Sequence, residues 1–233
     1  MLKKTQKKRP PEQTSRARIV LEHTESSAKN FIEAFDTVRR ASGSSLQRAP
    51  TDEEQDLLRA ALVFSAAGLD STVKQLIRSC LRDLAVSDSA VQREFQTYAE
   101  RQLRGDSEAS EPIGGYRFLA RLLVAPSPQD RLIEEYIEAL TGTSLQSADQ
   151  LFKAAKALGL NPYDLPAQKE DLEKIFDVRN KIIHELDVKF GAQVGWRKRN
   201  SRTRPILEDY SNKLIQVSKH MIEAVEKKLA GSS

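Results

Sequence analysis

A long apolar stripe in the second quarter of the chain constrains the fold more than any other feature. Between residues 58 and 84, apolar or small side chains recur every three or four positions, the repeat of one face of an α-helix. Thr51 and Glu54 have the spacing of a capping box, which predicts the start of this helix. The stripe consists of Leu58, Leu62, Ser65, Leu69, Val73, Leu76, Cys80 and Leu84. We therefore expect one long helix that buries this face against other helices.

The remaining segments favour helices as well. Apolar residues at 31–38 follow one helix face, and shorter helices are predicted over about 87–141. Ser147 with Gln150 predicts a second capping box, and its helix is expected to stop at Gly159. Further helices are predicted over about 168–186 and from Pro205 onward. No segment has the alternation of a strand, so the expected fold class is an all-α bundle.

Polar composition sets the expected domain boundaries. Residues 1–14 are polar and basic, with two prolines, and are predicted to form a disordered arm. Residues 15–233 are predicted to form one helical domain, in which 188–204 is a basic, glycine-containing loop. Charged residues make up 30% of the chain, which predicts a well-solvated surface.

The sequence predicts neither a membrane-spanning segment nor a disulfide framework. No apolar run approaches the roughly 20 residues that span a bilayer. Cys80 is the single cysteine, which excludes an internal disulfide framework and makes a reducing cytoplasm the simplest setting.

The positive charge is concentrated in two short segments. Residues 1–9 and 196–204 each carry five basic residues and no acid, whereas the whole chain has a net charge of +4. Subtracting five charges for each segment leaves −6 for the remainder. Such segments either bind a polyanion or serve only to increase solubility. In the second segment, the candidate substrate-binding residues are Arg197, Lys198, Arg199 and Arg202.

Arg179 breaks the apolar pattern of the helix predicted over 168–186. The buried stripe of this helix should pass through position 179, where an arginine is unfavourable unless it is paired or faces an interface. Asn180 and His184 are four residues apart and should project from the same helix face beside it. In isolation, a structural role for His184 would be the ordinary interpretation.

Asp70 is the second residue that departs from its surroundings. It lies among apolar residues of the long helix, one turn before Lys74. The two residues could form a local ion pair at the edge of the core. Alternatively, Asp70 could orient Arg179 or His184 from a neighbouring helix.

Other chemistries have no support in the sequence. Three isolated histidines and one cysteine give no metal-ligand spacing, so no metal and no cofactor are predicted. Neither a glycine-rich phosphate loop nor a nucleophile elbow is present.

The segment from Val178 to His184 resembles the Arg-x4-His motif of HEPN domains, in its Arg-Asn-x-x-x-His form. The run 147–165 is similar to the segment that precedes this motif in the RiboL-PSP branch of the superfamily. Asp70 and Lys74 resemble the acidic-x3-lysine pattern of an earlier family helix. The resemblance covers roughly residues 15–229, although the middle helices add little to it.

This resemblance implies a HEPN-like helical bundle with extra helices that forms a homodimer. The motif helices of two protomers would build one composite cleft that cuts RNA without a metal. His184 would transfer a proton, and Arg179 would bind the scissile phosphate. Asn180 would position the phosphate or the histidine, and Asp70 would orient the basic residues. Lys74 is assigned to substrate binding. A toxin or defence role and an antitoxin or regulatory protein as partner are further implications.

One departure and two alternatives accompany this hypothesis. Some HEPN toxins carry a modifiable tyrosine two residues after the histidine, where this chain has Leu186. One alternative is a non-catalytic, dimeric module that binds nucleic acid or a protein through the basic segments, with Trp196 either stacking or simply packed. The other is a helical adaptor in which Arg179 forms a structural ion pair.

Overall fold

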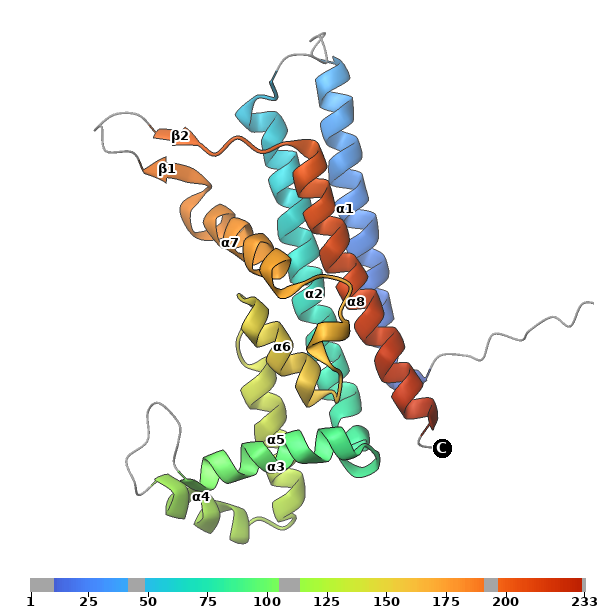
Figure 1. Ribbon diagram of the computed structural model, residues 1–233, viewed down its shortest axis with the longest axis vertical. Helices are drawn as coiled ribbons and strands as arrows, with labels where there is room; N and C mark the ends of the chain where they lie inside the picture. The colour runs from blue at the N-terminus through green and yellow to red at the C-terminus, as the bar shows by residue number, and fades with distance from the viewer. Residues whose placement is uncertain (1–10, 42–48, 105–113, 191–196, 232–233) are drawn as a thin grey trace, which may run out of the picture.

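The protein is an elongated assembly of eight α-helices with a small hairpin within the described residues, 11–41, 49–104, 114–190 and 197–231 of a computed structural model (Figure 1). In chain order the elements are η1 (Glu12–Thr14), α1 (Ser15–Ala41), α2 (Asp52–Ser87), α3 (Ser89–Arg104), α4 (Gly114–Leu123), α5 (Pro128–Thr141), α6 (Ala148–Ala157), η2 (Pro162–Asp164), α7 (Lys169–Glu185), β1 (Val188–Phe190), β2 (Arg197–Arg199) and α8 (Arg204–Gly231). The predicted all-α class is confirmed.

The long helix α2 is the centre of the fold. Helices α1 and α8 run beside it, and α3, α5, α6 and α7 also contact it. Every residue of the predicted stripe from Leu58 to Leu84 is buried. The predicted capping box is present as well, because Glu54 N donates to Thr51 Oγ1 at 3.2 Å and Thr51 N donates to Glu54 Oε2 at 2.8 Å. The capping box therefore located the start of this helix, and the periodicity of the sequence located its buried face.

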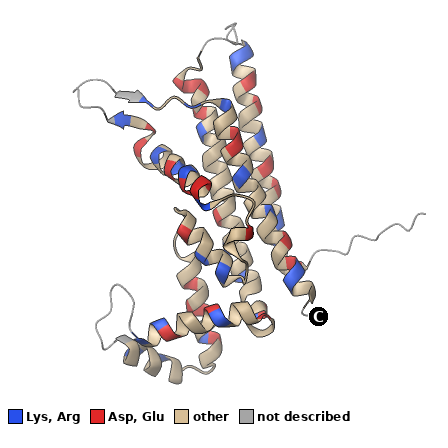
Figure 2. Ribbon diagram, in the orientation of Figure 1, with Lys and Arg blue, Asp and Glu red and all other residues tan. Residues whose placement is uncertain are grey.

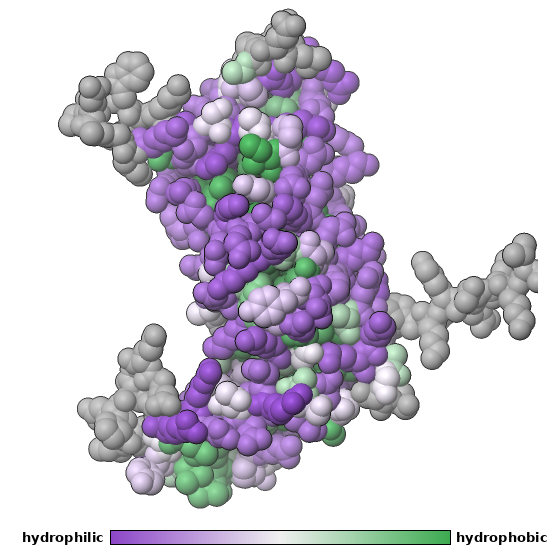
Figure 3. Space-filling model, in the orientation of Figure 1, coloured by the Kyte–Doolittle hydropathy of each residue, from purple (hydrophilic) through white to green (hydrophobic). Residues whose placement is uncertain are grey.

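The lower part of the molecule is built from shorter helices. Tyr136 of α5 packs against two rings of α3, with centroid distances of 5.7 Å to Phe95 and 4.5 Å to Tyr98. Figure 3 shows a mainly hydrophilic face, with apolar side chains gathered at the end where α4 lies. Tyr116 and Val124 in that region are about 80% exposed, at 80% and 83%. The predicted well-solvated surface is thus present over most of this face.

Two local expectations are wrong. Residues 188–190 and 197–199 form an antiparallel pair of strands, where a loop was expected and no strand was predicted. Residues 12–14 form a turn of 3-10 helix, although the arm was expected to extend to residue 14. Thr14 is buried, and its hydroxyl donates to Glu226 Oε1 at 2.6 Å. The first ten residues lie outside the described residues.

No helix in the described part of the chain is long and apolar enough to cross a membrane.

Gly68 marks a close contact between α1 and α2. A Cβ atom at this position would lie 2.0 Å from Oγ1 and 2.3 Å from Cγ2 of Thr24, which is buried on α1. The absence of a side chain at Gly68 thus lets the two helices approach.

The substitution Gly68→Ala tests this contact through the sign of its effect on the free energy of unfolding. Alanine at a helix interior normally stabilises by about 1 kcal/mol relative to glycine. Here we expect Gly68→Ala to lower the free energy of unfolding by about 1–3 kcal/mol, because the new methyl group overlaps Thr24. Denaturant unfolding would measure the change, and it should be smaller in a Thr24→Ala background. A more stable Gly68→Ala protein would contradict the close contact.

Candidate functional site

Helix α7 carries the predicted motif and is fixed to the core by one apolar face. Its buried residues are Leu172, Ile175, Phe176 and Ile182, and it packs on α2 and α6. Figure 2 shows acidic and basic residues mixed along α7, not a helix of one charge sign. The motif is therefore held rigidly, but it does not lie on a uniformly basic helix.

Arg179 is half-buried on this face with part of its hydrogen-bonding capacity unused. Its Nη1 donates to Asn180 Oδ1 at 2.9 Å, whereas the buried Nε has no hydrogen-bond partner in the described part of the chain. Burial lowers the pKa of the Arg179 guanidinium from its usual value, and the negative charge of Asp70 opposes this effect. A guanidinium keeps its proton at neutral pH even so. The site thus contains a partly desolvated cation that can accept an anion.

Asn180 and Asp70 hold the same backbone segment in front of α6. Asn180 Nδ2 donates to the carbonyl oxygen of Gln146 at 3.0 Å, and the Leu145 amide donates to Asp70 Oδ1 at 2.8 Å. Asp70 also forms the expected ion pair with Lys74, at 3.0 Å. These contacts bring Arg179, Asn180, Asp70 and the 145–146 segment together. They also give Asp70 and Asn180 structural roles that do not depend on any substrate.

His184 lies one helical turn beyond Asn180, in the last turn of α7, and is exposed. No described residue hydrogen-bonds to its imidazole. Its apolar neighbours Ile183 and Leu186 are also exposed, at 39% and 68%. Within one protomer, therefore, the end of α7 presents a free imidazole on a partly apolar surface.

A buried carboxylate fixes the chain immediately after this histidine. Asp187 is fully buried and has a left-handed backbone, with φ of 60°. Its Oδ2 accepts from Arg59 Nε at 3.1 Å and from Arg202 Nε at 2.7 Å, and its Oδ1 accepts from Asn200 Nδ2 at 2.9 Å. Burial alone would raise the pKa of this carboxyl, but the hydrogen bonds from Arg202, Asn200 and Arg59 hold the pKa below its usual value. Three segments distant in sequence are thereby joined at the end of α7.

The predicted substrate-binding arginines are engaged within the fold where they are described. Arg202 pairs with Asp187, as above, and Arg199 donates to the carbonyl oxygen of Leu186 at 2.9 Å and pairs with Asp56 at 2.7 Å. Arg197 and Lys198 belong to strand β2, and their side chains, like the whole of Trp196, lie outside the described residues. Arg199 and Arg202 thus anchor the hairpin and the approach to α8, whatever else they bind.

The described residues do not provide the groups that metal-dependent or cysteine-based catalysis requires. The described residues contain no cluster of three metal-binding side chains. Cys80 is buried in α2, and burial raises the pKa of its thiol to about 12, so it is not a thiolate nucleophile at neutral pH.

Sequence reasoning missed the 145–146 segment and the carboxylate at position 187. Arg59 and Asp187 are 128 residues apart, and no local pattern relates them.

Comparison of the chain with models of known protein families, with curated proteins and with solved structures found no match.

The Asp187 carboxylate should make the free energy of unfolding depend on pH. Because its folded-state pKa is lowered, its contribution is present above the ordinary carboxyl pKa of about 4 and is lost as pH falls through the folded value. We expect Asp187→Asn to lower the free energy of unfolding by about 3–5 kcal/mol near pH 7, because it removes the buried counter-charge that Arg59 and Arg202 share and leaves Arg59 only the exposed carboxylates of Asp52 and Asp56. Urea unfolding at several pH values should show the gap between wild type and variant narrowing below about pH 4. Parallel curves would refute this role.

Proposed function

We propose that the protein is a metal-independent endoribonuclease of HEPN type that works as a homodimer. The observation that carries this proposal is the state of Arg179. It is a half-buried guanidinium on an apolar helix face, with its Nη1 oriented by Asn180 and with an Nε that no described residue hydrogen-bonds. A phosphate is the ligand whose geometry and charge match a guanidinium best.

The reaction needs no group beyond the RNA and these side chains. The 2′-hydroxyl attacks the adjacent phosphorus, so a new O–P bond forms and the bond to the 5′-oxygen breaks. One imidazole accepts the proton of the 2′-hydroxyl, and an imidazolium gives a proton to the departing 5′-oxygen. Arg179 offsets the charge that develops on the phosphate oxygens. His184 is free to act in this way, because no described residue occupies its ring nitrogens.

A homodimer supplies what one protomer lacks. Two His184 side chains in one cleft would provide both the base and the acid. The exposed Ile183 and Leu186 flank His184 and give the two helices an apolar surface on which to meet. In this arrangement Asn180 is a positioning residue for Arg179, and Asp70 with Lys74 supports it from α2.

The alternative is a non-catalytic, dimeric module that binds nucleic acid or a protein partner. Two observations favour it: Asn180 and Asp70 are occupied in holding the 145–146 segment, and no described residue orients the His184 ring. In that case the basic residues near β2 would matter more than His184. The ribonuclease proposal also includes an antitoxin or regulatory protein as a partner, a toxin or defence role and a cytoplasmic setting.

The catalytic hypothesis predicts a selective loss in His184→Ala. Incubated with total RNA and a tRNA pool in excess EDTA, the wild type should cut RNA, and His184→Ala should be slower by about 100-fold to 10,000-fold. RNA binding, measured by gel shift, should stay nearly unchanged. His23→Ala is the matched control, because His23 is exposed on α1. Equal cutting by wild type and His184→Ala would rule out this histidine, and binding without cutting would favour the alternative.

Dimerisation through the end of α7 has its own test. Light scattering should give twice the mass of one chain for the wild type. The double variant Ile183→Glu/Leu186→Glu should be a monomer, because paired acidic residues oppose burial of that surface. Val86→Glu is the control, since Val86 is 70% exposed at the far end of α2. A monomeric wild type at working concentration would contradict the composite site.

A further inference from the structure

One open face of α2 carries no charge over about four turns. Positions 57, 60, 64, 67 and 71 follow the spacing of one helix face, and each is exposed or half-buried. They are occupied by Leu57, Ala60, Phe64, Ala67 and Ser71. Phe64 is the largest of them and is 50% exposed. Because charged residues make up 30% of the chain, an open helix face without any of them is a departure that needs a physical reason.

Helix α1 extends this uncharged surface. The ring centroids of Phe31 and Phe64 lie 5.0 Å apart, so an aromatic pair joins the two helices here. The same face of α1 also carries Ser27, Ala34 and Val38, of which Val38 is 43% exposed. These four residues of α1 and the five of α2 are called the α1–α2 strip below.

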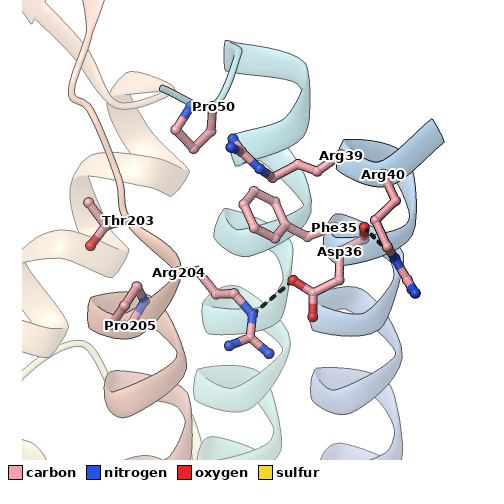
Figure 4. Close-up of a pocket in the computed structure, with 8 residues that line it drawn as sticks. All are labelled: Phe35, Asp36, Arg39, Arg40, Pro50, Thr203, Arg204 and Pro205. Carbon is pink, nitrogen blue, oxygen red and sulfur yellow. Dashed lines mark hydrogen bonds and ion pairs between the residues drawn. The ribbon is translucent and has the colours of Figure 1, made fainter. Parts of the chain in front are cut away.

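The side of α1 that faces α8 has a different character. There Asp36 pairs with Arg204 at 3.0 Å, and Figure 4 shows the two side chains reaching toward each other from α1 and α8. Lys29 and Glu33 pair at 3.6 Å beside α8 on the same side. The junction of α1 with α8 is therefore built with charges, whereas the strip has none.

Helix α7 borders the strip without covering it. Arg59 bonds to Asp187 just beyond the end of α7, and the charge of Asp70 acts on Arg179. Arg59 and Asp70 thus mark the face of α2 that is turned toward α7. Each directly precedes a residue of the strip, which places the strip about 100° further round the axis of α2. The strip and α7 are therefore neighbouring parts of one side of the molecule.

The proposed homodimer needs more surface than the end of α7 provides. Ile183 and Leu186 are two exposed apolar residues, whereas a stable interface usually buries about 800 Å² per partner and involves about 20–30 residues a side. A second copy of the chain would supply the missing surface, because a two-fold contact places the strip against itself. Uncharged surface would then meet uncharged surface, and no ion would lose its hydration.

We infer that the α1–α2 strip is the main contact between two copies of the chain, with Phe64 close to the two-fold axis. Phe64 is the middle residue of the five on α2, and antiparallel packing of the two α2 helices would set it against the partner's Ala60 and the partner's Ala67. A two-fold axis of this kind also places each α7 beside the α7 of the other copy. The inference rests on the homodimer of the proposed function, but not on its ribonuclease chemistry.

Sedimentation equilibrium on the full chain tests the inference at position 64. Phe64→Glu and Phe64→Lys should each raise the dissociation constant of the dimer by at least about 100-fold, because like charges would be buried together. An equimolar mixture of the two variants should dimerise again, since position 64 then faces an opposite charge. Ile19→Glu is the control and should dimerise like the wild type, because Ile19 is 53% exposed near the start of α1, twelve positions before Phe31.

A second variant separates loss of contact from loss of folding. Ala67 is exposed, so Ala67→Glu should weaken the dimer while thermal unfolding of the monomer stays unchanged. A monomeric wild type would leave the strip to a different protein and overturn the inference. So would unchanged dimerisation of both Glu variants, or a mixture of Phe64→Glu and Phe64→Lys that stays monomeric. A dimer that depends on the strip but cuts no RNA would support this inference and contradict the ribonuclease proposal alone.

Discussion

The burial of α2 on most of its circumference is the constraint on which the rest of the structure depends. Its stripe from Leu58 to Leu84 can leave water only if other helices cover it, and α1 and α8 provide most of that cover. The contact at Gly68 shows how close this packing is. The remaining helices attach to faces that α1 and α8 leave open. Helix α7 is one of them, and its position is therefore set by the core before any functional residue is considered.

Charges within this framework serve mainly to join segments that are distant in sequence. Asp187 connects the end of α7 to Arg59 on α2 and to the approach of α8. Asp70 and Asn180 connect α2 and α7 to the start of α6. The same interactions limit which residues remain for a ligand. Arg199 and Arg202 are committed to partners in the fold, whereas no described residue hydrogen-bonds the Nε of Arg179 or the ring of His184.

The sequence predicted features that depend on short-range repeats. The buried face of α2, its capping box and the position of Arg179 within the stripe of α7 all follow from spacings of three or four residues. The hairpin was missed because three-residue strands are too short to show alternation, and its register depends on turn and packing. The Arg59–Asp187 pair joins positions 128 residues apart, which no local pattern encodes. The HEPN resemblance and the site roles that it implies remain predictions.

The partial burial of Arg179 bears on the choice between a structural arginine and an anion-binding arginine. A structural arginine would normally satisfy its buried donors within the fold, because an unpartnered one costs about 1–3 kcal/mol. Among the described residues, the buried Nε of Arg179 has no such partner. Asp70 acts on Arg179 through its charge, while the oxygens of Asp70 bond to Leu145 and Lys74. An anion can reach only the exposed part of the guanidinium, because the Nε itself has almost no exposed surface. The helical-adaptor hypothesis places Arg179 in a structural ion pair, but no carboxylate among the described residues lies within ion-pair distance of it, and the phosphate site remains a proposal.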